Sequence, residues 1–278
     1  MEYTLKQPLT VLEALTRLSP GSSKTTLREW IKEGRIVVDG EPVKLANTML
    51  QAEQTIALTG KKRVMAAKVP ILYEDAHLVV VDKPVGWLSV ATNFEKEETI
   101  HGFLKDRYRP KKIYVVHRLD QDTSGVMLFA LTEEAYEGLK ALFKSHTIDR
   151  EYVAVSEGKL ASEKGTWQSY LQEDANYHVH SSQNPEKGQL AITHYEVMSS
   201  ARNTLLKLRL ETGKKNQIRV HCQENGCPII GDKKYGGRDS LVKRLCLHAH
   251  LLGFIHPITH KAMSFRSPIP EKFYHLLK

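Results

Sequence analysis

The chain has 278 residues, of which 41% are hydrophobic, and it carries a formal net charge of +8 at pH 7. This length suits one large domain or two unequal ones, and the apolar share is sufficient for a sizeable core. The excess positive charge favours a polyanionic partner, because phosphate backbones attract basic surfaces whatever their sequence. Nucleic acid is therefore the leading expectation for the partner.

The amino terminus and the cysteine content indicate where the protein works. Met1 to Lys6 lacks the basic and then apolar layout of a secretory signal peptide. No apolar run approaches the roughly 20 residues that a membrane span needs. Three cysteines, an odd number, favour free thiols over a disulfide framework. We therefore expect a cytoplasmic protein without a membrane partner.

Residues 1–60 are predicted to form a small αβ module. Apolar residues recur at helical spacing in 11–18 and again in 27–31, with a Pro-Gly-Ser break between them. The β-rich run 35–38 leads into Asp39-Gly40, which is a strong signal for a tight hairpin turn. Two helices followed by a small sheet are thus expected.

This module resembles the small RNA-binding module named after ribosomal small-subunit protein four, over about Ser22 to Leu58. In that family a helix pair presents basic and hydroxyl residues to RNA. The second helix usually starts with Ser-Arg, whereas this chain has Ser23-Lys24, which keeps the charge but loses the guanidinium fork. The resemblance makes Lys24 a candidate RNA contact; the alternative is a packed cap without an RNA role.

A basic linker is predicted at residues 61–70, and a second domain at residues 71–278. Strands outnumber helices there, and few βαβ alternations occur, which favours an α+β fold with a mixed, largely antiparallel sheet and flanking helices. The predicted strands are 77–82, 113–116, 126–130, 151–155, 192–198, 204–210 and 246–251, and the predicted helices are 99–106, 133–144 and 216–225. Glycine-rich phosphate-binding patterns are missing from the sequence, so we expect no nucleotide cofactor.

The run 117–125 reads His-Arg-Leu-Asp-Gln-Asp-Thr-Ser-Gly and lies between two short apolar runs. Asp120 is therefore expected on a loop braced by two strands, which would hold a reactive carboxylate more firmly than a free loop. The alternative is a purely structural turn, because Asp, Thr, Ser and Gly are all turn formers.

Six ordered blocks from Ile71 to Pro270 resemble the RluA-like pseudouridine synthases. They are Asp82–Gly86, His117–Gly125, Glu151–Val155, Thr212–His221, Gly231–Gly236 and Leu247–Pro257. The resemblance implies a domain with a central RNA-binding cleft that isomerises uridine to pseudouridine, without a redox cofactor or a metal. The expected substrate is large-subunit ribosomal RNA, with transfer RNA as the alternative substrate, and the protein is expected to be a monomer. A catalytically silent RNA-binding assembly factor is the alternative function.

The same resemblance assigns roles to individual residues. Asp120 matches the catalytic aspartate, Arg219 the arginine that keeps it ionised, and Tyr152 the tyrosine that lies against the target pyrimidine. Arg118 matches the arginine that helps to hold open the gap left by an extruded base. Around Arg219 the chain departs from the family, because Lys214 and Lys215 precede Asn-Gln where relatives often carry Arg and His. This departure concerns RNA contacts rather than the reaction.

The three cysteines raise the competing idea of a zinc site. Cys222, Cys227 and Cys246 occur near His221, His248 and His250 in the sequence. Structural zinc sites usually show a pair of ligands, two to four residues apart, in each half, and a second such pair is missing here. We therefore assign no metal ligand, and expect Cys222 and Cys246 to be small apolar residues in packed elements.

Overall fold

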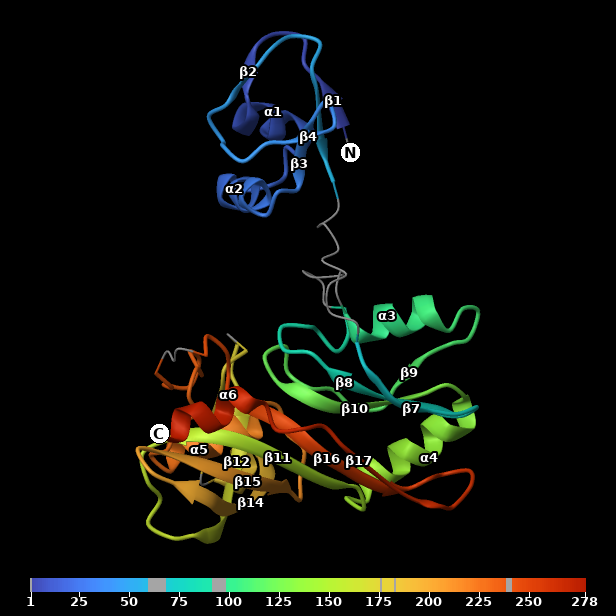
Figure 1. The fold of residues 1–278 in the computed structure, drawn as a ribbon, viewed down its shortest axis with the longest axis vertical. Helices are drawn as coiled ribbons and strands as arrows, with labels where there is room; N and C mark the ends of the chain where they lie inside the picture. The colour runs from blue at the N-terminus through green and yellow to red at the C-terminus, as the bar shows by residue number, and fades with distance from the viewer. Residues whose placement is uncertain (1, 60–68, 92–98, 176, 183, 239–241) are drawn as a thin grey trace. The chain divides into compact units, whose positions relative to one another are not determined.

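The structure is a computed structural model that describes residues 2–59, 69–91, 99–175, 177–182, 184–238 and 242–278. The chain divides into two compact units, Met1–Ala67 and Lys68–Lys278, which are considered separately (Figure 1). Of the predicted linker at 61–70, residues 61–68 lie outside the described residues. Among the described helices, none is both long and apolar enough to cross a membrane.

The first unit packs two helices with two small sheets around one core. Its elements are β1 (Glu2–Thr4), β2 (Leu9–Thr10), α1 (Val11–Leu18), α2 (Lys24–Lys32), β3 (Ile36–Val38), β4 (Glu41–Pro42), β5 (Met49–Leu50) and β6 (Thr55–Leu58). Strands β1, β6, β3 and β4 form one sheet in that order, and β2 pairs with β5. Helix α1 begins with a reciprocal capping box between Thr10 and Glu13. The predicted hairpin turn is confirmed, since Asp39 and Gly40 both have positive φ and join β3 to β4.

The second unit is built on one large sheet. Its strands are β7 (Ile71–Glu74), β8 (Leu78–Lys83), β9 (Tyr114–Val115), β10 (Ser124–Ala130), β11 (Asp149–Glu157), β12 (Lys164–Glu173), β13 (Val179–Ser182), β14 (Gln189–Ser200), β15 (Asn203–Leu210), β16 (Leu247–Ile255) and β17 (Ala262–Arg266). Its helices are α3 (Ile100–Arg107), α4 (Glu133–Lys144), α5 (Gln217–Glu224) and α6 (Glu271–Tyr274), with short 3-10 turns η1 (Pro185–Lys187) and η2 (His275–Leu277). The main path runs β13-β12-β14-β15-β11-β16-β10-β8-β7, with β17 beside β16 and β9 beside β10.

Both faces of the β8–β10 region are covered, and this explains its near-continuous apolar sequence. Val79 and Val81 pack with Ile100 and other residues of α3, whereas Leu78 and Val80 pack with α4. The two helices accordingly lie on opposite faces of these strands (Figure 1). Alternate residues of a strand point to opposite faces, so apolar residues are needed at every position.

The β10–β16 pair is parallel, whereas the other strand pairs of this sheet are antiparallel. The prediction of a mixed, largely antiparallel α+β fold is therefore confirmed. Gly125 makes the parallel contact possible. Its φ is +115°, and a Cβ atom placed there would lie 2.1 Å from the carbonyl oxygen of Ala249. Only glycine accommodates both the dihedral angle and the close approach.

We expect Gly125→Ala to destabilise the second unit by more than about 3 kcal/mol, the upper end of backbone strain alone, because the methyl group also collides with β16. The matched control is Gly158→Ala, at φ +69° with open space around the position, for which we expect a loss of about 1–2 kcal/mol. Urea unfolding of the full chain measures both free energies. Equal losses would mean that the approach to Ala249 imposes no constraint.

Candidate active site

Asp120 lies on the loop between β9 and β10, and both of its chain neighbours are anchored. The Ser89 hydroxyl donates to the Leu119 carbonyl at 2.6 Å and accepts from the Leu119 amide at 3.0 Å. On the other side, the Lys83 ammonium donates to the Gln121 carbonyl at 2.9 Å. Because the backbone is held on either side, the Asp120 carboxylate has a defined position just before β10 begins.

Lys83 is fully buried, which is unusual for lysine. Burial lowers the pKa of its amine to about 7, although Asp122 and Asp120 nearby favour the charged form. Its Nζ atom also donates to the Pro84 carbonyl at 3.1 Å. A neutral amine has two N–H groups, so both forms of Lys83 can satisfy the two carbonyls.

The start of α5 is fixed by Gln217, whose side chain makes four hydrogen bonds. Its Oε1 accepts from the Thr212 hydroxyl at 2.9 Å and from the Lys214 amide at 3.0 Å. Its Nε2 donates to the Ile192 carbonyl at 2.9 Å and to the Thr193 hydroxyl at 3.0 Å. A buried amide with all its groups satisfied specifies one geometry, and α5 is thereby placed against β14.

Arg219 on α5 bridges two carboxylates. Its Nε and Nη2 each lie 2.8 Å from an oxygen of the buried Asp232 in a bidentate fork, and its Nη1 lies 3.4 Å from Asp120 Oδ2 and 3.3 Å from Asn216 Oδ1. Burial by itself would lower the pKa of Arg219, but Asp232 and then Asp120 outweigh it and raise that pKa. A permanent cation therefore faces Asp120, and its orientation is set by Asp232.

Tyr152 approaches the same site from β11. A register shift between Glu151 and Tyr152 interrupts the pairing with β16, and Tyr152 then pairs with Ala249. Burial of the phenol raises its pKa to about 12, with Asp120 adding to the rise and Arg150 opposing it. The hydroxyl thus keeps its proton throughout the neutral pH range.

His117 is a structural residue in this geometry. Its Nε2 accepts the Leu128 amide of β10 at 3.0 Å, and its ring stacks on Phe143 with the centroids 4.9 Å apart. Burial, reinforced by the positive charge of Arg150, lowers its pKa to about 3. It is therefore neutral near pH 7 and holds the loop against β10.

A cavity of about 720 Å³ collects the candidate residues of the second unit. Arg118, Asp120, Tyr152, Lys214, Lys215 and Arg219 all line it. Counting only residues that the structure describes, six lysines and arginines line the cavity and Asp120 is its single acidic residue. Lys24 belongs to the other unit, where it is exposed in the first turn of α2 after the Ser23 cap. Such a cavity suits a polyanionic substrate that is brought to one carboxylate.

Several residues that shape the site were not predicted from the sequence. Asp232 and Gln217 were seen only as parts of sequence blocks, and their burial beside Arg219 and α5 depends on the fold. Arg150 was not considered; its guanidinium donates to the Glu211 carbonyl at 3.2 Å and lines the cavity. No local signal distinguishes Arg150, because it stands between Asp149 and Glu151 in a charged run at the start of β11.

The cysteines are free and buried. The histidines near them in sequence have other partners: His221 bonds to Thr193 at 2.9 Å and to Ser169 at 3.1 Å, and His248 bonds to Ser124 at 2.9 Å. Cys222, Cys227 and Cys246 all pack in the core of the β11–β15–α5 region. Cys222 lies in α5 and Cys246 directly precedes β16, and both are buried, as expected of small apolar residues.

Comparison with known proteins identifies the class to which this geometry belongs. Residues 77–224 match the RNA pseudouridylate synthase family, and residues 12–56 match the S4 domain. The chain therefore belongs to the RNA pseudouridine synthases, which are isomerases acting on RNA, and it carries an S4 domain at its amino terminus.

Curated relatives match nearly the whole chain. Ribosomal large subunit pseudouridine synthase D of Pseudomonas aeruginosa is 34% identical, with 94% of this chain and 88% of the relative covered. The uncharacterized RNA pseudouridine synthase YhcT of Bacillus subtilis is 33% identical, with 92% and 89% covered. The solved structure of human RNA pseudouridylate synthase domain containing 4 shares the fold, with a TM-score of 0.62 at 24% identity over 74% of this chain and 90% of that one.

The buried amine of Lys83 predicts a pH dependence of stability. Its pKa is about 7 in the folded chain and has its ordinary, higher value when unfolded. Between these values the unfolded chain binds more protons, so this group makes the free energy of unfolding increase with pH. We expect Lys83→Met to remove that increase, measured by urea unfolding at several pH values across the window.

The control for this measurement is Lys261→Met, which replaces an exposed lysine. Its free energy of unfolding should follow the wild-type pH dependence. A Lys83→Met protein with an unchanged pH dependence would show that Lys83 keeps its ordinary pKa in the fold.

Proposed function

We propose that the chain converts specific uridines in structured RNA to pseudouridine through the carboxylate of Asp120, and that its substrate is large-subunit ribosomal RNA. The observation that carries this proposal is the position of Asp120. It is anchored through both neighbours, it faces Arg219, and it is the single acidic residue among the described residues lining a basic cavity.

The chemistry requires a carboxylate and little else. The bond between the ribose C1′ and the base N1 breaks, the base turns, and a bond forms from C1′ to C5; C5 finally loses its proton and N1 gains one, so the product is an isomer of the substrate. Asp120 acts either as the nucleophile on the sugar or base, or as the base that removes a ribose proton. The isomerisation involves no net oxidation or reduction. Both routes use the carboxylate of Asp120, which lines this cavity.

Arg219 and Tyr152 support Asp120 in different ways. Arg219 places a cation 3.4 Å from the Asp120 carboxylate, where the two opposite charges attract. Tyr152 presents a protonated phenol and an aromatic face beside Asp120, and we assign it to stacking on the target pyrimidine near C5.

The uridine must leave the RNA stack before any carboxylate can reach it. Arg118 is exposed at the cavity, directly before Leu119 and Asp120 in the chain. A guanidinium can both stack and bind phosphate, so we assign Arg118 to helping hold open the gap that the extruded base leaves. Lys214 and Lys215 then contact the phosphates on either side.

We further propose that residues 1–60 form an RNA-binding module, joined by a linker at 61–70 to a catalytic domain at 71–278. The S4 match over residues 12–56 and the exposed Lys24 on α2 support this assignment. The relatives named as large-subunit enzymes favour ribosomal RNA over transfer RNA. The three free thiols suit the cytoplasm, where we expect the chain to work as a monomer.

Replacing Asp120 with Asn keeps the size and the turn-forming ability but removes the charge. We expect Asp120→Asn to abolish pseudouridine formation, with RNA affinity and stability close to wild type, because phosphate contacts supply much of the binding. Tritium release from RNA labelled at uridine C5 measures the reaction, with unmodified ribosomal and transfer RNA compared as substrates.

Asp122→Asn is the matched control, since it makes the same change two positions away in the same loop and should retain activity. Arg219→Ala should also lose turnover, and Tyr152→Phe should slow turnover more than it weakens binding. Appreciable release by Asp120→Asn would remove Asp120 from its role, and release from transfer RNA alone would replace the substrate proposal.

The lysines at the cavity predict a salt-dependent affinity. We expect the combined change Lys214→Ala and Lys215→Ala to weaken RNA binding at low salt. The slope of log affinity against log salt should fall by about 0.7–0.9 for each phosphate that the variant no longer neutralises. Filter binding over a range of salt concentrations measures the slope. Lys261→Ala, an exposed lysine of the β16–β17 turn, is the control and should leave the slope unchanged.

A further inference from the structure

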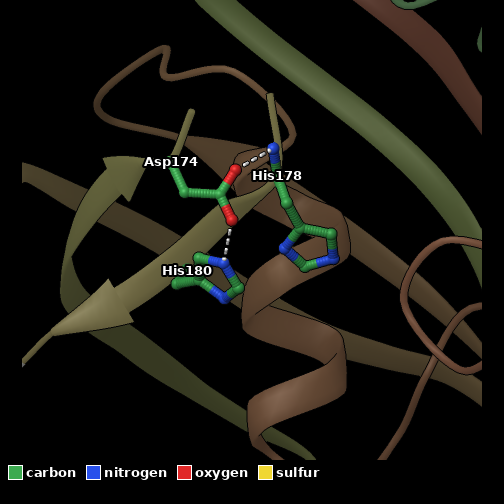
Figure 2. A group of neighbouring side chains, drawn as sticks. All are labelled: Asp174, His178 and His180. Carbon is green, nitrogen blue, oxygen red and sulfur yellow. Dashed lines mark hydrogen bonds and ion pairs between the residues drawn. The ribbon is translucent and has the colours of Figure 1, made fainter. Parts of the chain in front are cut away.

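The β12–β13 hairpin gathers three side chains with metal-binding chemistry. Asp174 follows β12, His178 precedes β13 and His180 lies within it, and one potential ligand atom from each lies within 4.8 Å of the others. Figure 2 shows the two imidazoles beside each other and beside the carboxylate. We propose that these three residues bind one divalent transition-metal cation of the zinc class.

The backbone brings the three ligands together. His178 and His180 are two residues apart on an extended segment, so their side chains leave the same face. The Asp174 amide donates to the His178 carbonyl at 2.8 Å, and the His178 amide donates to Asp174 Oδ1 at 2.9 Å. The turn thus sets the carboxylate opposite the imidazoles without any ion.

The ring of His178 is oriented as in a metal ligand. Its Nε2 faces the carbonyl of Lys234 at 3.5 Å, and the ring packs between those of His180 and Tyr235, with centroids 4.4 and 4.8 Å away. Its Nδ1 is shielded from solvent and has no hydrogen-bond partner among the described residues. Metal-bound histidines commonly donate their outer N–H to a backbone carbonyl, which leaves the inner nitrogen free for the ion.

The inner nitrogen is directed at the other two ligands. In Figure 2 one ring nitrogen of His178 points toward the pair formed by Asp174 Oδ2 and His180 Nε2, which are 2.9 Å apart. An ion entering between them displaces the proton of that hydrogen bond and gives the unpartnered Nδ1 a ligand contact. This is the independent observation that distinguishes the group from an ordinary surface His–Asp pair.

The dimensions and donor types fit zinc. With bond lengths of about 2.1 Å, tetrahedral ligand atoms lie about 3.4 Å apart. The observed spread of up to 4.8 Å therefore closes with small rotations of the side chains. Two imidazoles and one carboxylate suit zinc or a neighbouring divalent metal, and the fourth position takes water.

The nearby ammonium groups already have oxygen partners. Lys215 forms an ion pair with Glu173, and Lys234 Nζ donates to the Tyr177 carbonyl at 2.7 Å. Strand β13 is at the edge of the sheet and pairs with β12. An ion held by Asp174, His178 and His180 would therefore stabilise the turn between β12 and β13 at this sheet edge, close to Lys215 at the cavity.

The test is a metal titration of the full chain, without a histidine tag and after chelator treatment. We expect Co²⁺ to bind with one ion per chain and to give the visible bands of a tetrahedral site, and Zn²⁺ to displace it. Asp174→Asn and His180→Ala should each weaken Zn²⁺ binding by at least about tenfold, as loss of groups that support a site does. Because His180 is exposed, His180→Ala should fold normally.

His194→Ala is the matched control, because it removes another exposed histidine that bonds to a hydroxyl and a carboxylate, those of Thr166 and Glu211. It should bind Zn²⁺ like the wild type, and hydrogen exchange at the β12–β13 turn should slow when Zn²⁺ is added to either protein. Zn²⁺ affinity that is unaffected by Asp174→Asn and His180→Ala would overturn the proposal, as would a thiolate charge-transfer band from the buried cysteines. Neither result depends on pseudouridine formation.

Discussion

The guanidinium of Arg219 is the interaction on which the site depends, because it connects two parts of the chain that are far apart in sequence. It forms a bidentate pair with Asp232, whose side chain is completely buried. From α5 it also reaches Asp120 on the loop between β9 and β10. A buried ion pair costs desolvation on both sides and contributes chiefly by fixing geometry. Here the geometry that it fixes is a cation facing a carboxylate.

The two partners of Arg219 differ in exposure, and this separates their roles. Asp232 has no exposed side-chain area, whereas Asp120 keeps 34%. The fully buried carboxylate orients the arginine, and the accessible one remains free to meet a substrate. A single charge therefore has both a structural contact and a contact available for chemistry.

Anchoring of the Asp120 loop depends on groups that are themselves buried. Ser89 and Lys83 hold the residues on either side of Asp120, and Gln217 holds the start of the helix that carries Arg219. Each of these polar side chains satisfies backbone groups that would otherwise be unpaired in the core. The hydrogen bonds that allow these polar side chains to be buried therefore also hold the backbone of the site in place.

The sequence by itself predicted the broad fold and the main charged and aromatic candidates that line the cavity. Helix 133–144, the Asp39-Gly40 hairpin and the strand that follows Asp120 have strong local signals, namely a Thr132 cap, a turn dipeptide and an unbroken apolar run. These signals are local because caps, turns and side-chain periodicity act within a few residues. The motif blocks likewise placed Asp120, Tyr152 and Arg219, and the structure brings all three to one cavity.

Other features were decided only by the tertiary structure. Strand β17 was not predicted, because it has five residues and its alternation rests on only two apolar side chains, Met263 and Phe265. Strand β12 was missed although Trp167 and Leu171 alternate, since Ser169 occupies the buried position between them. The buried Asp232 and the depressed pKa of Lys83 arise when distant segments meet. No local pattern contains them, because desolvation depends on neighbours that are set by the fold.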